Sequence, residues 1–189
     1  MTNTLLIETI QQFRSPILDS LFIVLNFFDT FSFFLILIPA LWFSKGWKIG
    51  MRFYSILFLQ SLIVDALKKT LILPRPFHLD PSLGIIKVSG YGFPSGAAAS
   101  AMLFSALLIT YWKNPLKWAI LIPYFTLLSL SRMYLGVHFL EDIIAGWGIG
   151  IFSWSIFVYI LPKIEVWFTK KTLPTCFLLS LLFPLLTMA

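Results

Sequence analysis

Long apolar runs separated by short polar stretches dominate this chain. An α-helix needs about 20 mostly apolar residues to cross a membrane, and runs of this kind cover residues 49–73, 94–112, 117–135, 138–161 and 172–188. An earlier run over residues 17–44 is broken by two aspartates and an asparagine. We interpret 16–28 as a short interfacial helix and 30–44 as the first crossing. The pattern therefore predicts an all-α, polytopic membrane bundle of about six transmembrane helices.

The N-terminal residues predict helices that lie in the membrane interface. Residues 1–14 lack the basic start and the cleavage site of a secretory signal, and their pattern favours an amphipathic interfacial helix. If residues 16–28 crossed as well, there would be seven crossings and the N-terminus would change sides. The expected organisation is one membrane-embedded domain over 1–189, with interfacial helices in 1–28, a motif-bearing core in 30–160 and a last crossing at 172–188.

The composition favours a membrane protein and excludes several other classes. Hydrophobic residues make up 59% of the 189 residues and charged residues only 12%, against about 25% charged in a soluble domain. A soluble domain of this size could not bury so much apolar surface. A disordered chain, a coiled coil and an ordinary soluble enzyme are therefore excluded. Cys176 is the single cysteine, so no disulfide can form within the chain.

The net charge of +6 is distributed unevenly over the predicted connections. The connections 45–52, 113–117 and 162–171 hold eight Lys and Arg residues, more than the opposite face. Because loops rich in Lys and Arg stay in the cytoplasm, the other face is expected to point outward. Basic loops contact anionic head groups, so we expect the lipid bilayer as a partner and no nucleic acid. The short chain and small loops favour a bacterial cytoplasmic membrane.

Polar residues that are costly near membrane depth form three clusters on the predicted outward face. They lie in residues 68–76, 92–97 and 131–142. Residues 74–93, which contain several prolines and glycines, form the only long connection and predict a structured surface loop. Charged and hydroxyl groups on one face of a membrane protein indicate a functional site there.

The third cluster contains a candidate nucleophile. His138 and Asp142 are four residues apart, so on a helix they share one face and can form a hydrogen bond. A carboxylate that accepts one imidazole N–H leaves the lone pair of the other nitrogen free to attack. Arg132 precedes His138 by six residues. A helix–turn–helix would bring its guanidinium to the group that His138 attacks.

The other two clusters supply groups that bind anions. Lys68 and Arg75 are cations. Ser95 precedes the backbone N–H groups of Gly96 and Ala97, which the sequence places at a helix N-terminus. Taken singly, such residues have ordinary roles, because arginines anchor head groups and a lone histidine usually packs in a core. Together the clusters indicate a tetrahedral oxyanion such as phosphate and suggest phosphoryl transfer to a histidine.

These clusters resemble the motifs of the type 2 phosphatidic acid phosphatase family, membrane lipid phosphatases related to vanadium haloperoxidases. Lys68 and Arg75-Pro76 match the first motif, which is Lys, six residues and Arg-Pro. The third motif is Ser-Arg, five residues, His, three residues and Asp, and its matches are Ser131, Arg132, His138 and Asp142. The second motif, Pro-Ser-Gly-His, is matched except at its last position. The resemblance covers about residues 30–160.

The resemblance implies a helical bundle that hydrolyses a lipid phosphate ester or anhydride without a metal or a cofactor. It implies that His138 is the nucleophile and that Asp142 orients it. The residues implied to hold the phosphoryl oxygens are Lys68, Arg75, Ser95, Gly96 and Arg132.

The departure from the family lies at Ala97, where the family has a histidine that protonates the leaving oxygen. General acid catalysis typically contributes about 10²–10⁴-fold. Three explanations remain open: an exchange of histidine for alanine that silences the enzyme or traps its substrate, a pyrophosphate substrate whose leaving group needs less protonation, or binding without hydrolysis. His78 is a neighbouring residue that could supply a proton instead.

The substrates that fit this interpretation are undecaprenyl pyrophosphate, phosphatidic acid, phosphatidylglycerol phosphate and a lipid A phosphate. A polyprenyl pyrophosphate is favoured slightly, because the missing acid matters least there. The alternative is a catalytically silent or deliberately inactivated membrane protein that binds lipid phosphate.

Overall fold

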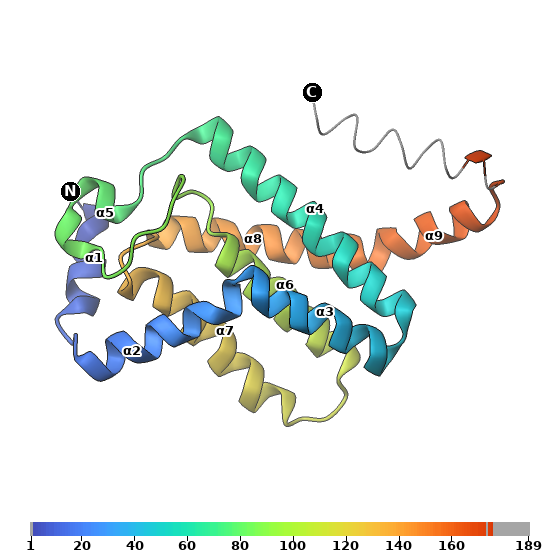
Figure 1. Ribbon diagram of the computed structural model, residues 1–189, viewed down its shortest axis with the longest axis horizontal. Helices are drawn as coiled ribbons and strands as arrows, with labels where there is room; N and C mark the ends of the chain where they lie inside the picture. The colour runs from blue at the N-terminus through green and yellow to red at the C-terminus, as the bar shows by residue number, and fades with distance from the viewer. Residues whose placement is uncertain (1, 173, 176–189) are drawn as a thin grey trace. The chain divides into compact units, whose positions relative to one another are not determined.

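A computed structural model describes residues 2–172, 174 and 175 (Figure 1). The chain divides into two compact units, Met1–Trp154 and Ser155–Ala189, and each is described by itself. Within the described residues all regular structure is helical. The predicted last crossing at 172–188 falls almost wholly outside them, as does Cys176.

The helices of the first unit follow the apolar runs. In chain order they are α1 (Thr2–Gln11), α2 (Pro16–Leu25), the short 3₁₀ helix η1 (Asn26–Asp29), α3 (Phe31–Lys45), α4 (Trp47–Leu71), α5 (Pro76–Leu79), the 3₁₀ helix η2 (Pro81–Leu83), α6 (Gly96–Tyr111), α7 (Lys117–Tyr134) and α8 (Leu140–Ser155). The expected structured loop at 74–93 therefore contains two short helices. Capping residues explain where some of the longer helices begin.

Side-chain caps fix the starts of α2 and α3. The hydroxyl of Ser15 accepts the backbone N–H of Leu18 at the start of α2, where Pro16 occupies the first helical position. Thr30 accepts from the N–H of Phe33 at the start of α3. Such caps satisfy N–H groups that have no partner inside the helix. The Asn26–Thr30 corner is therefore a defined break between α2 and α3.

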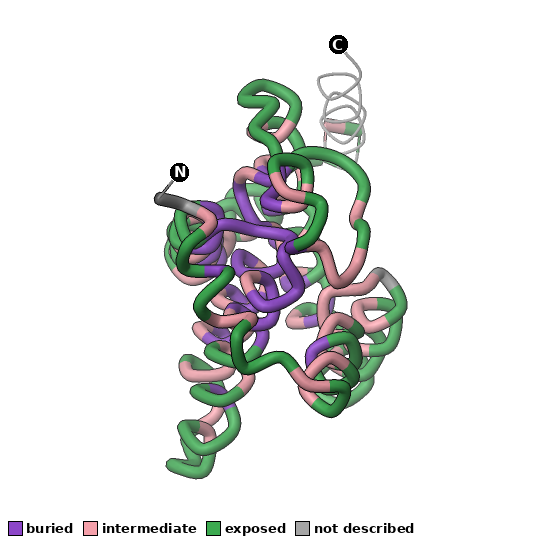
Figure 2. The backbone as a smooth tube through the Cα atoms, turned by 90° about the vertical axis from the view of Figure 1, so that its left-hand side faces the viewer, coloured by how far each residue is buried: buried purple, intermediate pink, exposed green. Residues whose placement is uncertain are grey.

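The N-terminal helices pack on the end of α7. Phe22 of α2 joins Tyr134, Leu135 and Val137 in a buried cluster. The side-chain amide of Gln11 donates to the carbonyl oxygens of Leu83 and Tyr134, at 2.9 and 2.8 Å. Figure 2 shows buried residues of the first unit gathered between helices, with exposed residues around them. These contacts hold the turn between α7 and α8 in place.

Large apolar side chains are exposed along several helices. Ile36 is 64% exposed, Phe43 93% and Ile122 55%. Soluble proteins rarely expose large contiguous apolar surfaces. A surface of this kind is typical of helices that contact lipid.

The length and composition of the observed helices identify fewer membrane spans than the six crossings that the apolar runs predict. Within the described residues, the helical run Leu140–Thr169 is long and apolar enough to cross a membrane. The pair Pro16–Asp29 and Ser32–Lys45, which is bent by 53°, passes the same test when taken together. The six predicted crossings are thus not confirmed and stay a prediction.

Two predicted connections are wrong in their bounds. The connection expected over 45–52 consists of Gly46 alone, which has a positive φ of 91° and lies between α3 and α4. In the second unit, residues expected as the loop 162–171 form α9 (Leu161–Thr169), which follows a π-helical turn, η3 (Ile156–Ile160). Proline is tolerated in the first turn of a helix, so Pro162 does not end the helical run. The lysines that suggested a loop are good helix formers.

Candidate active site

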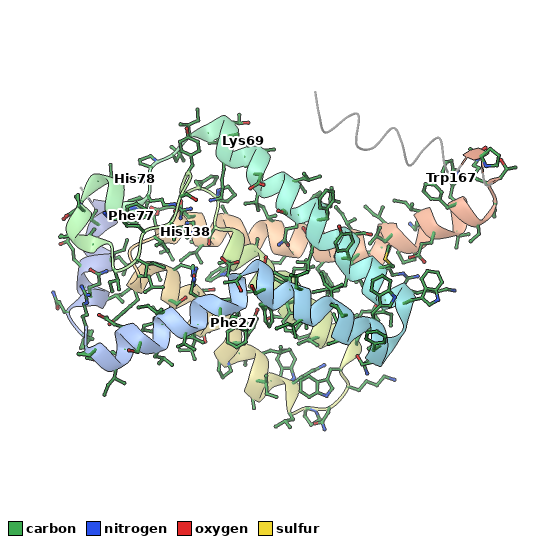
Figure 3. All side chains as sticks on the ribbon, viewed as in Figure 1. Phe27, Lys69, Phe77, His78, His138 and Trp167 are labelled. Carbon is green, nitrogen blue, oxygen red and sulfur yellow. The ribbon has the colours of Figure 1, made fainter. Side chains whose placement is uncertain are left out.

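A cavity of about 550 Å³ in the first unit brings the three sequence clusters together. Its lining includes most of the residues singled out from the sequence, namely Lys68, Arg75, Gly96, Ala97, Arg132 and His138. These residues come from the end of α4, the loop after it, the start of α6, the end of α7 and the turn that follows. Figure 3 labels His138 among the side chains at this end of the unit.

His138 is held by hydrogen bonds at both ring nitrogens. It lies two residues before α8 rather than on it, so the predicted shared helix face is wrong, but Asp142 in the first turn still reaches it. The His138 Nδ1 lies 3.2 Å from Asp142 Oδ2, and the backbone N–H of Phe139 donates to the same oxygen at 3.0 Å. A carboxylate only accepts hydrogen bonds, so Nδ1 carries the proton. Nε2 then carries the lone pair, which faces Arg75 Nη1 at 3.2 Å.

The environment of His138 keeps its imidazole neutral. The side chain is buried, with 5% of the residue exposed. The pKa of His138 is lowered to about 4, chiefly by burial; the hydrogen bond to Asp142 opposes this shift, and the nearby Arg75 adds to it. A neutral imidazole is the nucleophilic form. The ring is therefore in its reactive state over the whole physiological pH range.

Arg75 is fixed by backbone carbonyl groups. Its Nε donates to the carbonyl of Gly90 at 2.9 Å, and its Nη2 donates to the carbonyl of Ser89 at 3.2 Å. Its Nη1 donates to the carbonyl of Val137 at 3.0 Å and lies 3.2 Å from His138 Nε2. The guanidinium is thus oriented before any ligand arrives, beside the nitrogen that would attack.

Gly136 allows the turn that carries His138. Its φ is 70°, a conformation that side chains disfavour, and an added Cβ would collide with the Leu83 carbonyl. The turn therefore lies directly against η2. This close approach sets the position of the Val137 carbonyl and of His138.

Arg132 reaches the cavity from the last turn of α7. Its Nη1 donates to Asn26 Oδ1 at 2.7 Å and lies 3.8 Å from Asp29 Oδ2, and its Nε donates to the hydroxyl of Ser131 at 3.2 Å. Only 3% of the residue is exposed, yet its Nη2 has no hydrogen-bond partner among the described residues. A buried N–H group left free beside a cavity can bind a ligand oxygen.

Lys68 and the start of α6 form the opposite wall. The Lys68 ammonium donates to the carbonyl oxygens of Tyr91 and Gly92, at 2.7 and 3.1 Å, and so ties the loop to α4. Gly96 and Ala97 begin α6 at the cavity. The positive end of the α6 dipole therefore points to the same space as the cations.

Two predicted site residues do not line the cavity. Ser95 is fully buried, and its hydroxyl caps α6 by accepting the N–H of Ala98 at 3.3 Å. Its backbone N–H donates to the carbonyl of Asp142 at 2.9 Å. Asp142 lies on the other side of the His138 ring, 3.2 Å from its Nδ1. Direct contact of Ser95 with a phosphoryl oxygen therefore stays a prediction, while its structural role is plain.

His78, the candidate substitute acid, does not line the cavity. It is exposed on α5, and its Nδ1 accepts the backbone N–H of Arg75 at 3.2 Å. Figure 3 shows His78 on this short helix. At the position where the family has its acid, Ala97 is 2% exposed and lines the cavity.

Several polar residues that line the cavity were not predicted as site residues from the sequence. Asn26 and Asp29 belong to the α2–α3 corner, and Gln60 and Asp65 lie on α4. The sequence held a signal for the first two, since they interrupt an apolar run, and for Asp65, which is a charge inside another run. Their partners could not be read, because the contact between Asn26 and Arg132 joins residues 106 positions apart.

The arrangement can bind and receive a phosphoryl group. Three cations and a helix N-terminus surround the Nε2 of a neutral, oriented imidazole. This combination matches the charge of a tetrahedral oxyanion, and the nitrogen can act as a nucleophile toward phosphorus.

Comparisons with known proteins place the chain in a family. The family model of the PAP2 superfamily matches residues 49–165. The chain is 24% identical over 198 residues to lipid phosphate phosphatase delta of Arabidopsis thaliana, a match that covers 96% of this chain and 47% of the relative. It is 29% identical over 120 residues to undecaprenyl-diphosphatase of Sulfolobus acidocaldarius, covering 61% of this chain and 56% of the relative.

The fold also matches a solved structure. The crystal structure of Aquifex aeolicus LpxE superimposes with a TM-score of 0.75 at 26% identity, covering 84% of this chain and 95% of that one. The chain spans about half the length of the two curated relatives named above.

Proposed function

This chain belongs to the PAP2 superfamily, and we propose that it is a membrane phosphatase that hydrolyses a lipid-linked phosphate or pyrophosphate through a phosphohistidine at His138. The observation that carries the proposal is the setting of His138, with Asp142 3.2 Å from Nδ1 and Arg75 3.2 Å from Nε2. A histidine buried for packing alone would not need a fixed guanidinium beside the nitrogen that carries its lone pair.

The proposed reaction has two displacements. The Nε2 lone pair of His138 attacks phosphorus, an N–P bond forms, and the bond between phosphorus and the leaving oxygen breaks with its electron pair on that oxygen. Asp142 stabilises the positive charge that develops on the ring. A water molecule then attacks phosphorus and loses a proton to the departed oxyanion or to bulk water, while the N–P bond breaks and its electron pair returns to Nε2.

The cations take the role that a metal has in other phosphatases. Charge that develops on the phosphoryl oxygens is met by Arg75, by the free Nη2 of Arg132 and by Lys68 with the N-terminus of α6. We therefore propose a metal-independent reaction, at an outward-facing site in a bacterial cytoplasmic membrane.

Ala97 is the basis of a second candidate function. The methyl group has no proton to give to the leaving oxygen, and the exposed His78 stands outside the cavity lining. A phosphate leaving group tolerates this loss better than an alkoxide. A protein that holds a lipid phosphate without turning it over is the alternative that Ala97 favours.

Phosphate release from a panel of lipids tests the proposal. The panel holds undecaprenyl pyrophosphate, phosphatidic acid, phosphatidylglycerol phosphate and a lipid A phosphate, with this protein, Ala97→His and His138→Ala compared. We expect Ala97→His to raise the rate on monoesters by about 10²–10⁴-fold, because it adds a general acid. The gain should be smaller on the pyrophosphate.

His138→Ala should abolish release from every lipid, since it removes the atom that accepts the phosphoryl group. Turnover that survives in His138→Ala refutes the phosphohistidine route. A parent protein without activity, beside an active Ala97→His variant, supports the silent binder instead.

A further inference from the structure

The residues along one face of α4 mark three successive zones of the cavity. Lys68, Asp65, Ser61 and Leu57 line the cavity at intervals of three or four residues, so they follow one face of the helix. With a rise of about 1.5 Å per residue, Asp65 lies about 4.5 Å and Ser61 about 10 Å below Lys68 along the axis. The cavity is thus cationic at one end, rich in hydrogen-bond acceptors in the middle, and apolar beyond.

The middle zone contains a buried amide that is only half bonded. Gln60 is 2% exposed, and its Nε2 donates to the hydroxyl of Ser100 at 3.2 Å. The other end of the amide, Oε1, has no partner among the described residues, although Gln60 lines the cavity. Burying a polar atom without a hydrogen bond is costly. An unpaired polar atom of a cavity-lining residue indicates that a ligand group forms the missing hydrogen bond.

The groups at this amide set the chemistry of the middle zone. The free oxygen of Gln60 is an acceptor, and the Ser100 hydroxyl beside the amide can both donate and accept. The two carboxylates of the cavity lie elsewhere, because Asp29 is beside Arg132 and Asp65 is exposed. A ligand group that donates a hydrogen bond would therefore be favoured here.

The middle zone lies within reach of the reacting phosphorus. Ser100 is one turn from Ala97 on α6, about 4.5 Å along the axis, and both line the cavity. A hydroxyl on the carbon next to the phosphoester carbon is separated from phosphorus by a similar distance. One ligand can therefore occupy the cationic end and the middle zone together.

We propose that Gln60, with Ser100, forms a binding site for a hydroxyl group carried by the lipid head group next to its phosphate. A hydroxyl both donates and accepts, so it suits the free end of the Gln60 amide whichever way that amide is turned. The inference rests on the proposed function, and it narrows the substrate to phospholipids with such a hydroxyl. Phosphatidic acid and a polyprenyl pyrophosphate lack it.

A matched pair of lipids tests this site. The pair is a lysophosphatidate with a free hydroxyl next to its phosphate-bearing carbon, and its deoxy analogue with the same acyl chain. Binding is measured in lipid nanodiscs with the His138→Ala variant, which has no nucleophile to consume the lipid. We expect the hydroxylated lipid to bind about tenfold more tightly, the scale of one buried hydrogen bond.

Variants assign the preference to the middle zone. Gln60→Leu and Ser100→Ala, each made in the same background, should bring the ratio of the two Kd values close to one while the deoxy lipid binds as before. Gln12→Leu is the matched control, because Gln12 is exposed on the surface, and it should keep the full preference.

Equal affinities for the two lipids overturn the hydroxyl site, as does a preference that persists in both variants. If neither lipid binds, the site and the proposed function fall together. Absence of turnover by this protein and by Ala97→His counts against the phosphatase alone, because the binding comparison needs no chemistry.

Discussion

His138 is neutral at physiological pH because burial disfavours its charged form, and this has a measurable consequence. Its pKa is lowered to about 4, whereas an exposed histidine titrates near about 6.5. The nucleophile loses its lone pair only when pH falls through the lowered value. The acid limb of kcat/KM, which reports groups of the free enzyme, should therefore lie near pH 4, with no loss of rate between pH 7 and pH 5 from this residue.

The measurement is a pH profile of phosphate release by Ala97→His, whose second histidine contributes the opposite, alkaline limb as a general acid. Asp142 and Arg75 face the ring from α8 and from the loop after α4. An acid limb centred between pH 6 and 7 would show that His138 is solvated or is not the nucleophile.

At the scale of the elements, α8 lies very close to the start of α6. A Cβ on Gly146 would collide with the carbonyl oxygen of Ser95 and meet the Cβ of Ala98 at 3.0 Å. The neighbour is backbone, so it cannot move aside alone. Small residues allow helices to approach in this way, and here the approach places the N-terminus of α6 beside the turn of His138.

Gly146→Ala should therefore force α6 and α8 apart. We expect a lower Tm and at least about a tenfold loss of kcat, because small displacements of reacting groups are costly. Gly148→Ala is the control on the same helix, since its Cβ would meet nothing within 4 Å, and it should stabilise by up to about 1 kcal/mol through helix propensity. Equal Tm and activity in the two variants would contradict the close-packing argument.

The sequence predicts helices better than it predicts the contacts between them. Apolar runs located the long helices of the first unit within a few residues, because a helix that contacts lipid must be apolar over most of its length. The ends of α9 and the Gly46 turn were missed, since Lys and Glu suit a helix as well as a loop.

The residues of the site were predictable where they lie at a fixed separation in the sequence. They were not predictable where a contact depends on the path of the backbone through the fold. His138 and Asp142 could be paired from a separation of four residues. The carbonyl groups of Ser89, Gly90 and Val137 that orient Arg75 could not, because every residue has a carbonyl and only the fold selects one. Ser95 was predicted to hold a phosphoryl oxygen, and that contact stays a prediction. The capping of α6 by its hydroxyl was not predicted.

At the scale of the whole molecule, the length of α4 relates the site to the membrane. The helix has 25 residues, about 37 Å at 1.5 Å per residue, which exceeds a hydrocarbon core of about 30 Å. Its last turn carries Lys68 at the cavity, and its first turn carries Lys48 near Gly46. Figure 1 shows α4 running from its turn with α3 to the loop before α5. If α4 spans the bilayer, these two ends lie on opposite faces.

The excess of Lys and Arg near Gly46 then predicts which end is outside. We expect Ser44, at the basic end, to face the cytoplasm and Lys87, in the exposed loop beside the site, to face outward. Single cysteines at these positions, Ser44→Cys and Lys87→Cys in a Cys176→Ser background, can be treated in intact spheroplasts with a maleimide that does not cross membranes. Lys87→Cys should be labelled directly and Ser44→Cys only after permeabilisation, with the Cys176→Ser parent unlabelled throughout. The reverse pattern would place the site in the cytoplasm, and labelling of both positions in sealed spheroplasts would mean that α4 does not span the membrane.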